Sequence, residues 1–287
     1  MKPPPFEYVR ATSVEEALAT LAESGPDAKL LAGGQSLVPM LNLRLARPSV
    51  LVDLNRIPDL DRLRSENGSV RIGALARQAA VDASQLVRDR LPLLSEALPY
   101  VGHFATRNRG TVGGSIVHAD PAAELPLALT VLGGSVVAVS TRGERTISAE
   151  ELFVSHFLTT LEPDELIVDT IWPAAPASSG YAFEELAQRR GDYGLCIAAC
   201  ALTVGNGRVE QGRVAVGSVT DRPLVVDVGL AGCTVDTETA RAAGEVAAAA
   251  VEPPGNLHAS PAYLKQLTRV LVERAVGRAW RNALEAP

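Results

Sequence analysis

Residues 105–126 read ATRNRGTVGGSIVHADPAAELP, and this stretch carries the strongest signal in the chain. Its centre is a glycine-rich segment at 110–115, preceded by two arginines. Glycines let backbone N–H groups close on an anion, and the hydroxyls of Thr111 and Ser115 add further donors. Paired glycines would also suit a tight turn between two strands. The stretch alone therefore predicts either a phosphate-binding loop or a plain turn.

A second glycine segment, AGGQSL at 32–37, favours phosphate binding. It follows an apolar run directly, so the chain would leave a strand at its carboxyl end and enter this segment. Further strands are predicted at 6–9 and 50–54, and one of the two helices between them would begin after Ser13. Residues 1–57 therefore predict a small unit of parallel strands, whose ligand sites lie at strand ends.

The remaining residues divide into two further units. Strands and helices alternate through 58–176, and the stretch PAAPASSG at 173–180 has the composition of a linker. Beyond it, three alternating apolar runs predict an antiparallel meander, followed by two long helices, so the third unit is 177–287. Neither the GxGxxG nor the GxxxxGK[ST] fingerprint occurs, which argues against a Rossmann or P-loop nucleotide site.

Composition excludes several classes of function. The 287 residues are 47% hydrophobic and 21% charged, as expected for a globular protein with a sizeable core. The net charge is −6, and the densest basic groups are the pairs Arg107/Arg109 and Arg189/Arg190, not stripes, which argues against a nucleic-acid partner. No apolar run reaches the roughly 18 residues of a membrane span. Three cysteines and the lack of an export signal predict a cytoplasmic location, free or at the inner face of the membrane through a complex.

Three long motifs resemble those of one known family. They are LAGGQSLVPMLNLRLARPSVLVDLNRI at 31–57, VGHFATRNRGTVGGSIVHADPAAELP at 101–126 and RRGDYGL at 189–195. They look like the FAD-binding medium subunit of molybdenum hydroxylases, which include aerobic carbon monoxide dehydrogenase and enzymes acting on xanthine and N-heterocycles. The resemblance implies a mixed α+β architecture. Two subdomains of the p-cresol methylhydroxylase type would bind FAD, and a C-terminal domain of three antiparallel strands plus helices would follow.

The resemblance also implies the cofactor site. FAD would lie between the first two units, with its pyrophosphate held by both glycine segments and its adenine end lined by Val101 and Gly102. The implied FAD-binding positions are Ala32, Gly33, Gly34, Gln35, Ser36, Leu37, Val101, Gly102, Thr111, Val112, Gly113, Gly114, Ser115, Glu124, Ile167 and Tyr193. No catalytic residue and no metal ligand are expected in this chain.

Some of these side chains have plain structural alternatives. The resemblance makes Glu124 and Ile167 contacts of the FAD and places Tyr193 beside the isoalloxazine ring. By residue chemistry alone, Glu124 could merely complement a helix N-terminus, whereas the other two could be core side chains. His118 and Asp120 attract attention as acid–base groups, but we expect them to support the loop.

The implied function is electron transfer within a complex. The partners would be an iron–sulfur small subunit and a molybdenum-cofactor large subunit, arranged as a dimer of heterotrimers. Electrons would pass from the clusters through FAD to an external acceptor. Carbon monoxide is the leading substrate, with xanthine, N-heterocycles or aldehydes as alternatives. Two rival hypotheses remain, namely a stand-alone FAD-dependent oxidoreductase and a non-enzymatic FAD-dependent scaffold.

Overall fold

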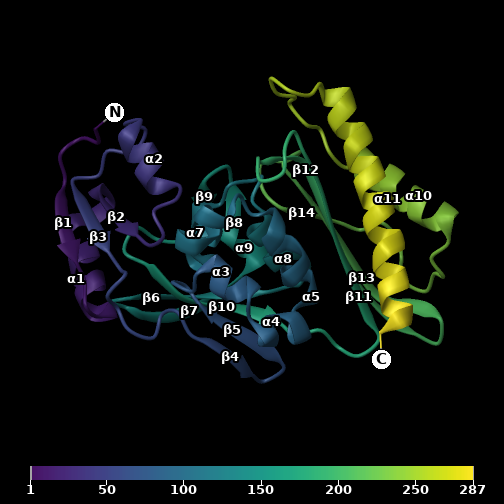
Figure 1. Ribbon diagram of the computed structural model, residues 1–287, viewed down its shortest axis with the longest axis horizontal. Helices are drawn as coiled ribbons and strands as arrows, with labels where there is room; N and C mark the ends of the chain where they lie inside the picture. Colours follow the sequence, from purple (N-terminus) through teal and green to yellow (C-terminus); the bar gives the residue numbers. More distant parts are fainter. Residues whose placement is uncertain (1, 287) are drawn as a thin grey trace.

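The computed structural model describes residues 2–286 and begins with a small parallel sheet (Figure 1). Its elements are β1 (Glu7–Arg10), α1 (Val14–Ser24), β2 (Ala28–Leu31), α2 (Leu37–Asn42) and β3 (Val50–Asp53). β3 lies between the other two strands and is parallel to both. The Ser13 side chain caps α1 by accepting a hydrogen bond from the Glu16 N–H. The order and the parallel pairing predicted for this unit are confirmed.

A five-stranded antiparallel sheet forms the centre of the molecule. Its strand order is β4 (Leu63–Glu66), β5 (Ser69–Gly73), β10 (Leu166–Pro173), β6 (Ser135–Ser140) and β7 (Gly143–Ser148). The helices of this part are α3 (Gln78–Asp82), α4 (Gln85–Arg90), α5 (Pro92–Ala97), α6 (Phe104–Arg109), α7 (Val112–His118), α8 (Glu124–Val131) and α9 (Ala149–Leu152). A short hairpin of β8 (Phe153–Ser155) and β9 (Leu158–Thr159) follows α9. All eight side chains of α8 are buried, so this helix runs through the main core.

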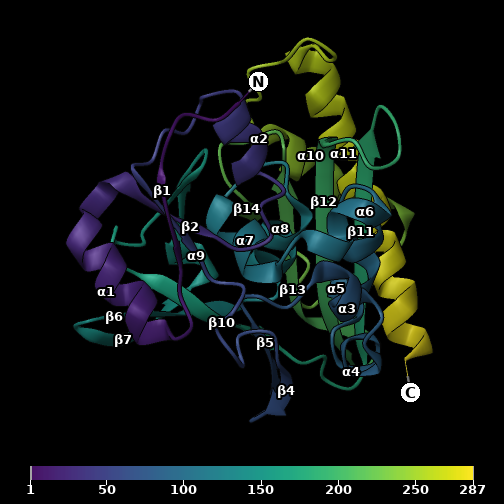
Figure 2. The ribbon, with the colours of Figure 1, turned by 60° about the vertical axis from the view of Figure 1, so that its left-hand side comes forward.

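The C-terminal part is an antiparallel sheet of β11 (Ser179–Ala187), β12 (Gly194–Gly205), β13 (Arg208–Gly217) and β14 (Leu224–Val226). Three strands were predicted, and the structure adds β14, which pairs with the end of β13. The three residues of β14 are too few to show an alternating pattern. Helices α10 (Thr237–Ala249) and α11 (Pro261–Glu285) cover one face, and α5 and α8 contact the other (Figures 1 and 2).

The predicted mixed α+β architecture is confirmed by these three sheets and their helices. The division into units at 1–57, 58–176 and 177–287 stays a prediction. None of the helices within residues 2–286 combines the length and apolar character needed to cross a membrane.

Arg278 on α11 ties the C-terminal part to the centre. Its guanidinium donates to Glu96 at 2.6 Å and lies 3.0 Å from the Glu184 carboxylate. Because Arg278→Ala would leave both half-buried carboxylates without this partner, we expect it to lower the free energy of unfolding by about 2 kcal/mol. Chemical denaturation of the FAD-free protein measures this loss. Arg274→Ala, on an exposed part of the same helix, should change stability by less than about 0.5 kcal/mol. Equal losses in the two variants would contradict the assigned role.

Candidate functional site

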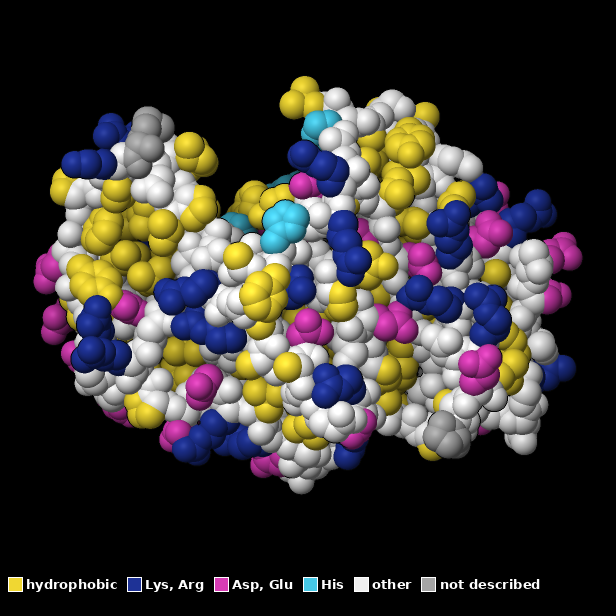
Figure 3. Space-filling model, viewed as in Figure 1, with side chains coloured by type: hydrophobic (Ala, Val, Ile, Leu, Met, Phe, Trp, Pro, Cys, Tyr) yellow, Lys and Arg dark blue, Asp and Glu magenta, His cyan; other side chains and the backbone are white. Residues whose placement is uncertain are grey.

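A cavity of about 600 Å³ opens between the parallel sheet and helices α6 and α7. The space-filling view shows the molecule hollowed between its N-terminal part and the remainder, with apolar side chains in the hollow (Figure 3). All the sequence-predicted positions except Val112 line this cavity, although they come from six separate stretches of the chain. Val112 is fully buried behind the wall and donates its backbone N–H to the Ala76 carbonyl. The structure therefore brings the predicted residues together in one place.

The first glycine segment supplies free hydrogen-bond donors. The backbone N–H groups of four successive residues have no hydrogen-bond partner within residues 2–286: Gly33, Gly34, Gln35 and Ser36. Gly34 adopts a φ of +73°, which an L side chain rarely allows. Successive unpaired N–H groups in a turn form a concave site that suits an anion. The segment has the form predicted for a phosphate-binding loop.

The second glycine segment differs from the prediction. It was expected to be a loop, but from Val112 onward it is helix α7, capped by Thr111, whose hydroxyl accepts from the Gly114 N–H at 3.1 Å. Within this helix Gly113 packs directly on Ala74, where a Cβ would come within 2.6 Å of the alanine Cβ.

This helix uses most of its own backbone donors. The N–H groups of Val112 and Gly113 donate to carbonyls of residues 76 and 74, and the Ser115 N–H donates to the Thr111 carbonyl. The hydroxyl hydrogen of Thr111 stays available because the oxygen only accepts from Gly114. The second segment therefore contributes hydroxyl groups and close packing to the cavity, whereas the first contributes the free N–H groups.

The two segments touch each other at glycines. A Cβ on Gly33 would lie 2.3 Å from the Arg109 carbonyl oxygen and 2.9 Å from the Gly110 Cα. Gly110 in turn packs on Gln78, whose side chain lines the cavity and whose Oε1 is buried without a partner within residues 2–286. A buried amide of this kind normally has a hydrogen-bond partner. The free N–H groups and the close contact between the two glycines fit a ligand with a pyrophosphate group, whereas the unpaired Gln78 oxygen is an acceptor and would need a donor group of the ligand.

Glu124 begins helix α8 and is 6% exposed at the cavity wall. Burial raises the pKa of its carboxyl to about 7, so at neutral pH the group is partly protonated. Asp120, just before it, accepts a hydrogen bond from the Ala122 N–H and shapes the turn into the helix. The His118 ring lies against Phe157, with centroids 5.0 Å apart, and burial lowers the pKa of this histidine. The contacts of Asp120 and His118 are those of supporting residues.

Ile167 reaches the cavity from a strand and Tyr193 from a loop. Ile167 is buried in β10 beside an irregularity in its pairing with β6. Tyr193 is 66% exposed on the connection between β11 and β12. A large exposed ring on a cavity wall is free to cover a ligand. The flavin contacts expected of both residues stay predictions.

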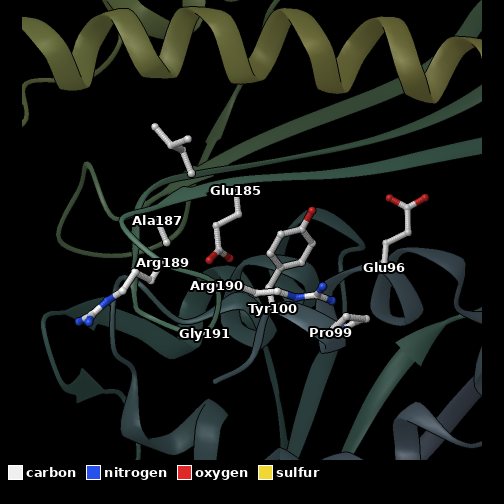
Figure 4. Close-up of a pocket in the computed structure, with 9 residues that line it drawn as sticks. Glu96, Pro99, Tyr100, Glu185, Ala187, Arg189, Arg190 and Gly191 are labelled. Carbon is white, nitrogen blue, oxygen red and sulfur yellow. The ribbon is translucent and has the colours of Figure 1, made fainter. Parts of the chain in front are cut away.

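The same β11–β12 connection borders a second cavity of about 520 Å³, which shares Gly191 with the first. Figure 4 shows Glu185 extending from β11 toward the stretch that carries Arg189 and Arg190, with the Tyr100 ring beside it. Burial raises the pKa of Glu185 to about 8, and the charge of Glu124 acts in the same direction. Sequence reasoning missed this cavity because no motif marks Tyr100 or Glu185.

Several lining residues of the first cavity were also missed. They are mostly apolar: Leu30, Met40, Ala46, Leu54, Leu75, Leu161 and Leu166. Apolar side chains in the sequence carry no sign of whether they will face a core or a ligand. Gln78 was the one with a usable signal, since it stands alone as a polar residue in the run QAAV that opens α3.

Comparison with known proteins identifies the class. The family model for the FAD binding domain in molybdopterin dehydrogenase matches residues 4–175, and that for the CO dehydrogenase flavoprotein C-terminal domain matches residues 181–279. Together they cover most of the chain. The chain therefore belongs to the FAD-binding medium subunits of the molybdenum hydroxylase family, a family of oxidoreductases. This confirms the predicted resemblance and FAD as the cofactor.

Individual relatives are similar over most of their length. The chain is 44% identical over 287 residues to the 6-hydroxypseudooxynicotine dehydrogenase complex subunit alpha of Paenarthrobacter nicotinovorans, covering 99% of this chain and 97% of that protein. It is 40% identical over 225 residues to the caffeine dehydrogenase subunit beta of Pseudomonas sp. (strain CBB1), covering 78% and 76%. A solved structure of carbon monoxide dehydrogenase from Hydrogenophaga pseudoflava matches with a TM-score of 0.96 at 37% identity, covering 98% of this chain and 99% of that one.

Proposed function

We propose that this chain binds FAD in the cavity between its two glycine segments and passes electrons from a partner's iron–sulfur clusters to an external acceptor. The observation that carries this proposal is the convergence of the free N–H groups of 33–36, the Thr111 hydroxyl and Glu124 on one cavity. FAD, when bound, supplies the redox chemistry. The protein's own residues bind and orient the cofactor, so no catalytic side chain is required.

Each part of the cavity would have a distinct task. The N–H groups of 33–36 and the hydroxyls of Thr111 and Ser115 would hold the pyrophosphate, and Val101 and Gly102 the adenine end. Glu124 would hold a proton at the cavity wall, because its pKa lies near neutrality. The exposed Tyr193 ring would cover the flavin and exclude water.

The substrate of the whole enzyme is set by its molybdenum subunit, so similarity of this chain gives only an indirect guide. The relatives named for 6-hydroxypseudooxynicotine and caffeine are 44% and 40% identical to the chain, whereas the carbon monoxide dehydrogenase chain is 37% identical. These identities favour the N-heterocycle alternative over carbon monoxide as the substrate class. We propose small iron–sulfur and large molybdenum subunits as partners, in a dimer of heterotrimers. The cytoplasmic location stays a prediction.

Co-purification followed by anaerobic titration tests the relay. The tagged chain, expressed in its native host, should bring down two further subunits with molybdenum and iron. Adding 6-hydroxypseudooxynicotine, caffeine or carbon monoxide in separate arms should bleach the flavin absorbance of the complex with one of them. The isolated FAD-loaded chain should keep its absorbance in every arm. Bleaching of the isolated chain would support the stand-alone oxidoreductase, and a complex that oxidises substrate while its flavin stays oxidised would support the scaffold.

A further inference from the structure

A chain of polar contacts runs from the end of β3 to the end of α6, beside the FAD cavity. The Asn55 amide donates to the Ala32 carbonyl at 2.9 Å and to the Asp53 carboxylate at 2.6 Å. The Arg77 guanidinium donates to the Asn55 Oδ1 at 2.6 Å and, through its other terminal nitrogen, to the Arg109 carbonyl. Asn55 and Arg77 thus connect the residue that starts the first glycine segment to the residue that precedes the second.

The carbonyls at the two ends of this connection lie where the two glycine segments touch. The Arg109 oxygen is the atom that lies against Gly33, where even a Cβ would not fit. Ala32 directly precedes Gly33, so its carbonyl lies in the same planar peptide as the Gly33 N–H and sets the direction of this first free donor. Holding both carbonyls therefore fixes the spacing of the two segments as well as the direction of the first.

We propose that Asn55 and Arg77 form a latch that sets the FAD affinity of the cavity, acting as positioning residues that do not touch the cofactor. This rests on the proposed assignment of the cavity to FAD. Neither side chain lines the cavity, which separates them from the groups expected to contact the ligand. The latch also joins the parallel sheet to the central part of the molecule, since Asn55 follows β3 and Arg77 precedes α3.

The residue types suit this task. Arginine presents several donors in a rigid fork, so one side chain can hold a side-chain oxygen and a backbone oxygen at once. Lysine has a single ammonium group on a flexible stem and would lose this fixed geometry. Asparagine accepts from Arg77 with its oxygen and donates to Ala32 with its nitrogen, so it passes the constraint from one contact to the other.

FAD titration of the flavin-free full chain tests the latch. Arg77→Met and Asn55→Ala should each raise the dissociation constant about tenfold, the change that losing one or two hydrogen bonds produces. The dissociation constant of the double variant should rise by much less than the product of the two single increases, because either change alone already breaks the latch. Arg77→Lys should recover only part of the affinity. Flavin fluorescence quenching gives the constants, and the melting temperature of each FAD-free variant is measured alongside.

Arg213→Met is the matched control. Arg213 also bridges a backbone carbonyl, that of Thr130, and a side chain, Glu150, but it lies away from the cavity. The Arg213→Met variant should have a lower melting temperature and an unchanged dissociation constant for FAD. A wild-type constant for Arg77→Met would overturn the latch, provided that Gly33→Ala in the same assay loses FAD. If Gly33→Ala also binds normally, the assignment of the cavity to FAD fails as well, so the two failures are distinguishable.

Discussion

Gly33→Ala should weaken FAD binding by about 100-fold. The added methyl group would overpack the contact between the two glycine segments, and overpacking of this kind costs about 1–3 kcal/mol. The added Cβ would overlap the Arg109 carbonyl oxygen at 2.3 Å, and that atom is backbone and cannot turn aside. The two glycine segments would have to separate, which would move the free N–H groups of 34–36 away from Thr111. The flavin content of the purified protein and the dissociation constant of FAD measure the effect.

Gly277→Ala provides the matched control for this substitution. Gly277 lies within α11, where a Cβ would meet only the Arg281 side chain at 3.7 Å. Alanine favours a helix over glycine, so this variant should bind FAD normally and be slightly more stable. Full flavin content in Gly33→Ala would show that the two segments do not meet at the cofactor.

Glu124→Gln should stabilise the FAD-free protein by an amount that grows with pH. Burial raises the pKa of Glu124 from 4.5 to about 7, so the folded state holds a proton that the unfolded state has released. Between these two values stability falls as the pH rises, and ionising the group in the folded state costs about 3 kcal/mol in all by linkage. Glutamine removes this cost. The gain should be absent near pH 4.5 and complete above about pH 8.

Urea denaturation of both proteins across this range gives the difference directly. Glu185, whose pKa burial raises to about 8, contributes a loss of the same sign at slightly higher pH. The variant that carries both Glu124→Gln and Glu185→Gln should therefore show the flattest profile. Glu252→Gln, a change at a carboxylate that is 92% exposed, serves as the control and should follow the wild type. A constant difference between wild type and Glu124→Gln at all pH values would contradict the buried acid.

The elements with strong local signals were predicted well from the sequence. The cap at Ser13, the strands around the first glycine segment and the two long helices near the C-terminus all follow from local patterns. The members of the site were also found, but through motifs that resemble a family. From spacing and composition alone, each glycine segment could have been either a phosphate-binding loop or a plain turn.

What the sequence missed depends on packing between distant residues. Helix α7 lies where a loop was expected, and its Gly113 packs on Ala74, which lies in a different part of the chain. Strand β14 exists because the edge of β13 is available to it. The latch of Asn55 and Arg77 and the cavity beside Tyr100 join segments that only the fold brings together. Such features carry no local pattern.

Hydrogen exchange with and without FAD tests the central claim most directly. The amides of Gly33, Gly34, Gln35 and Ser36 have no partner within residues 2–286, so in the FAD-free protein they should exchange quickly. Bound FAD should slow these four amides, while the amides of β12 and β13 should not change. Protection confined to the cavity beside Tyr100 and Glu185, with 33–36 still exchanging freely, would contradict the assignment of FAD to the cleft between the glycine segments.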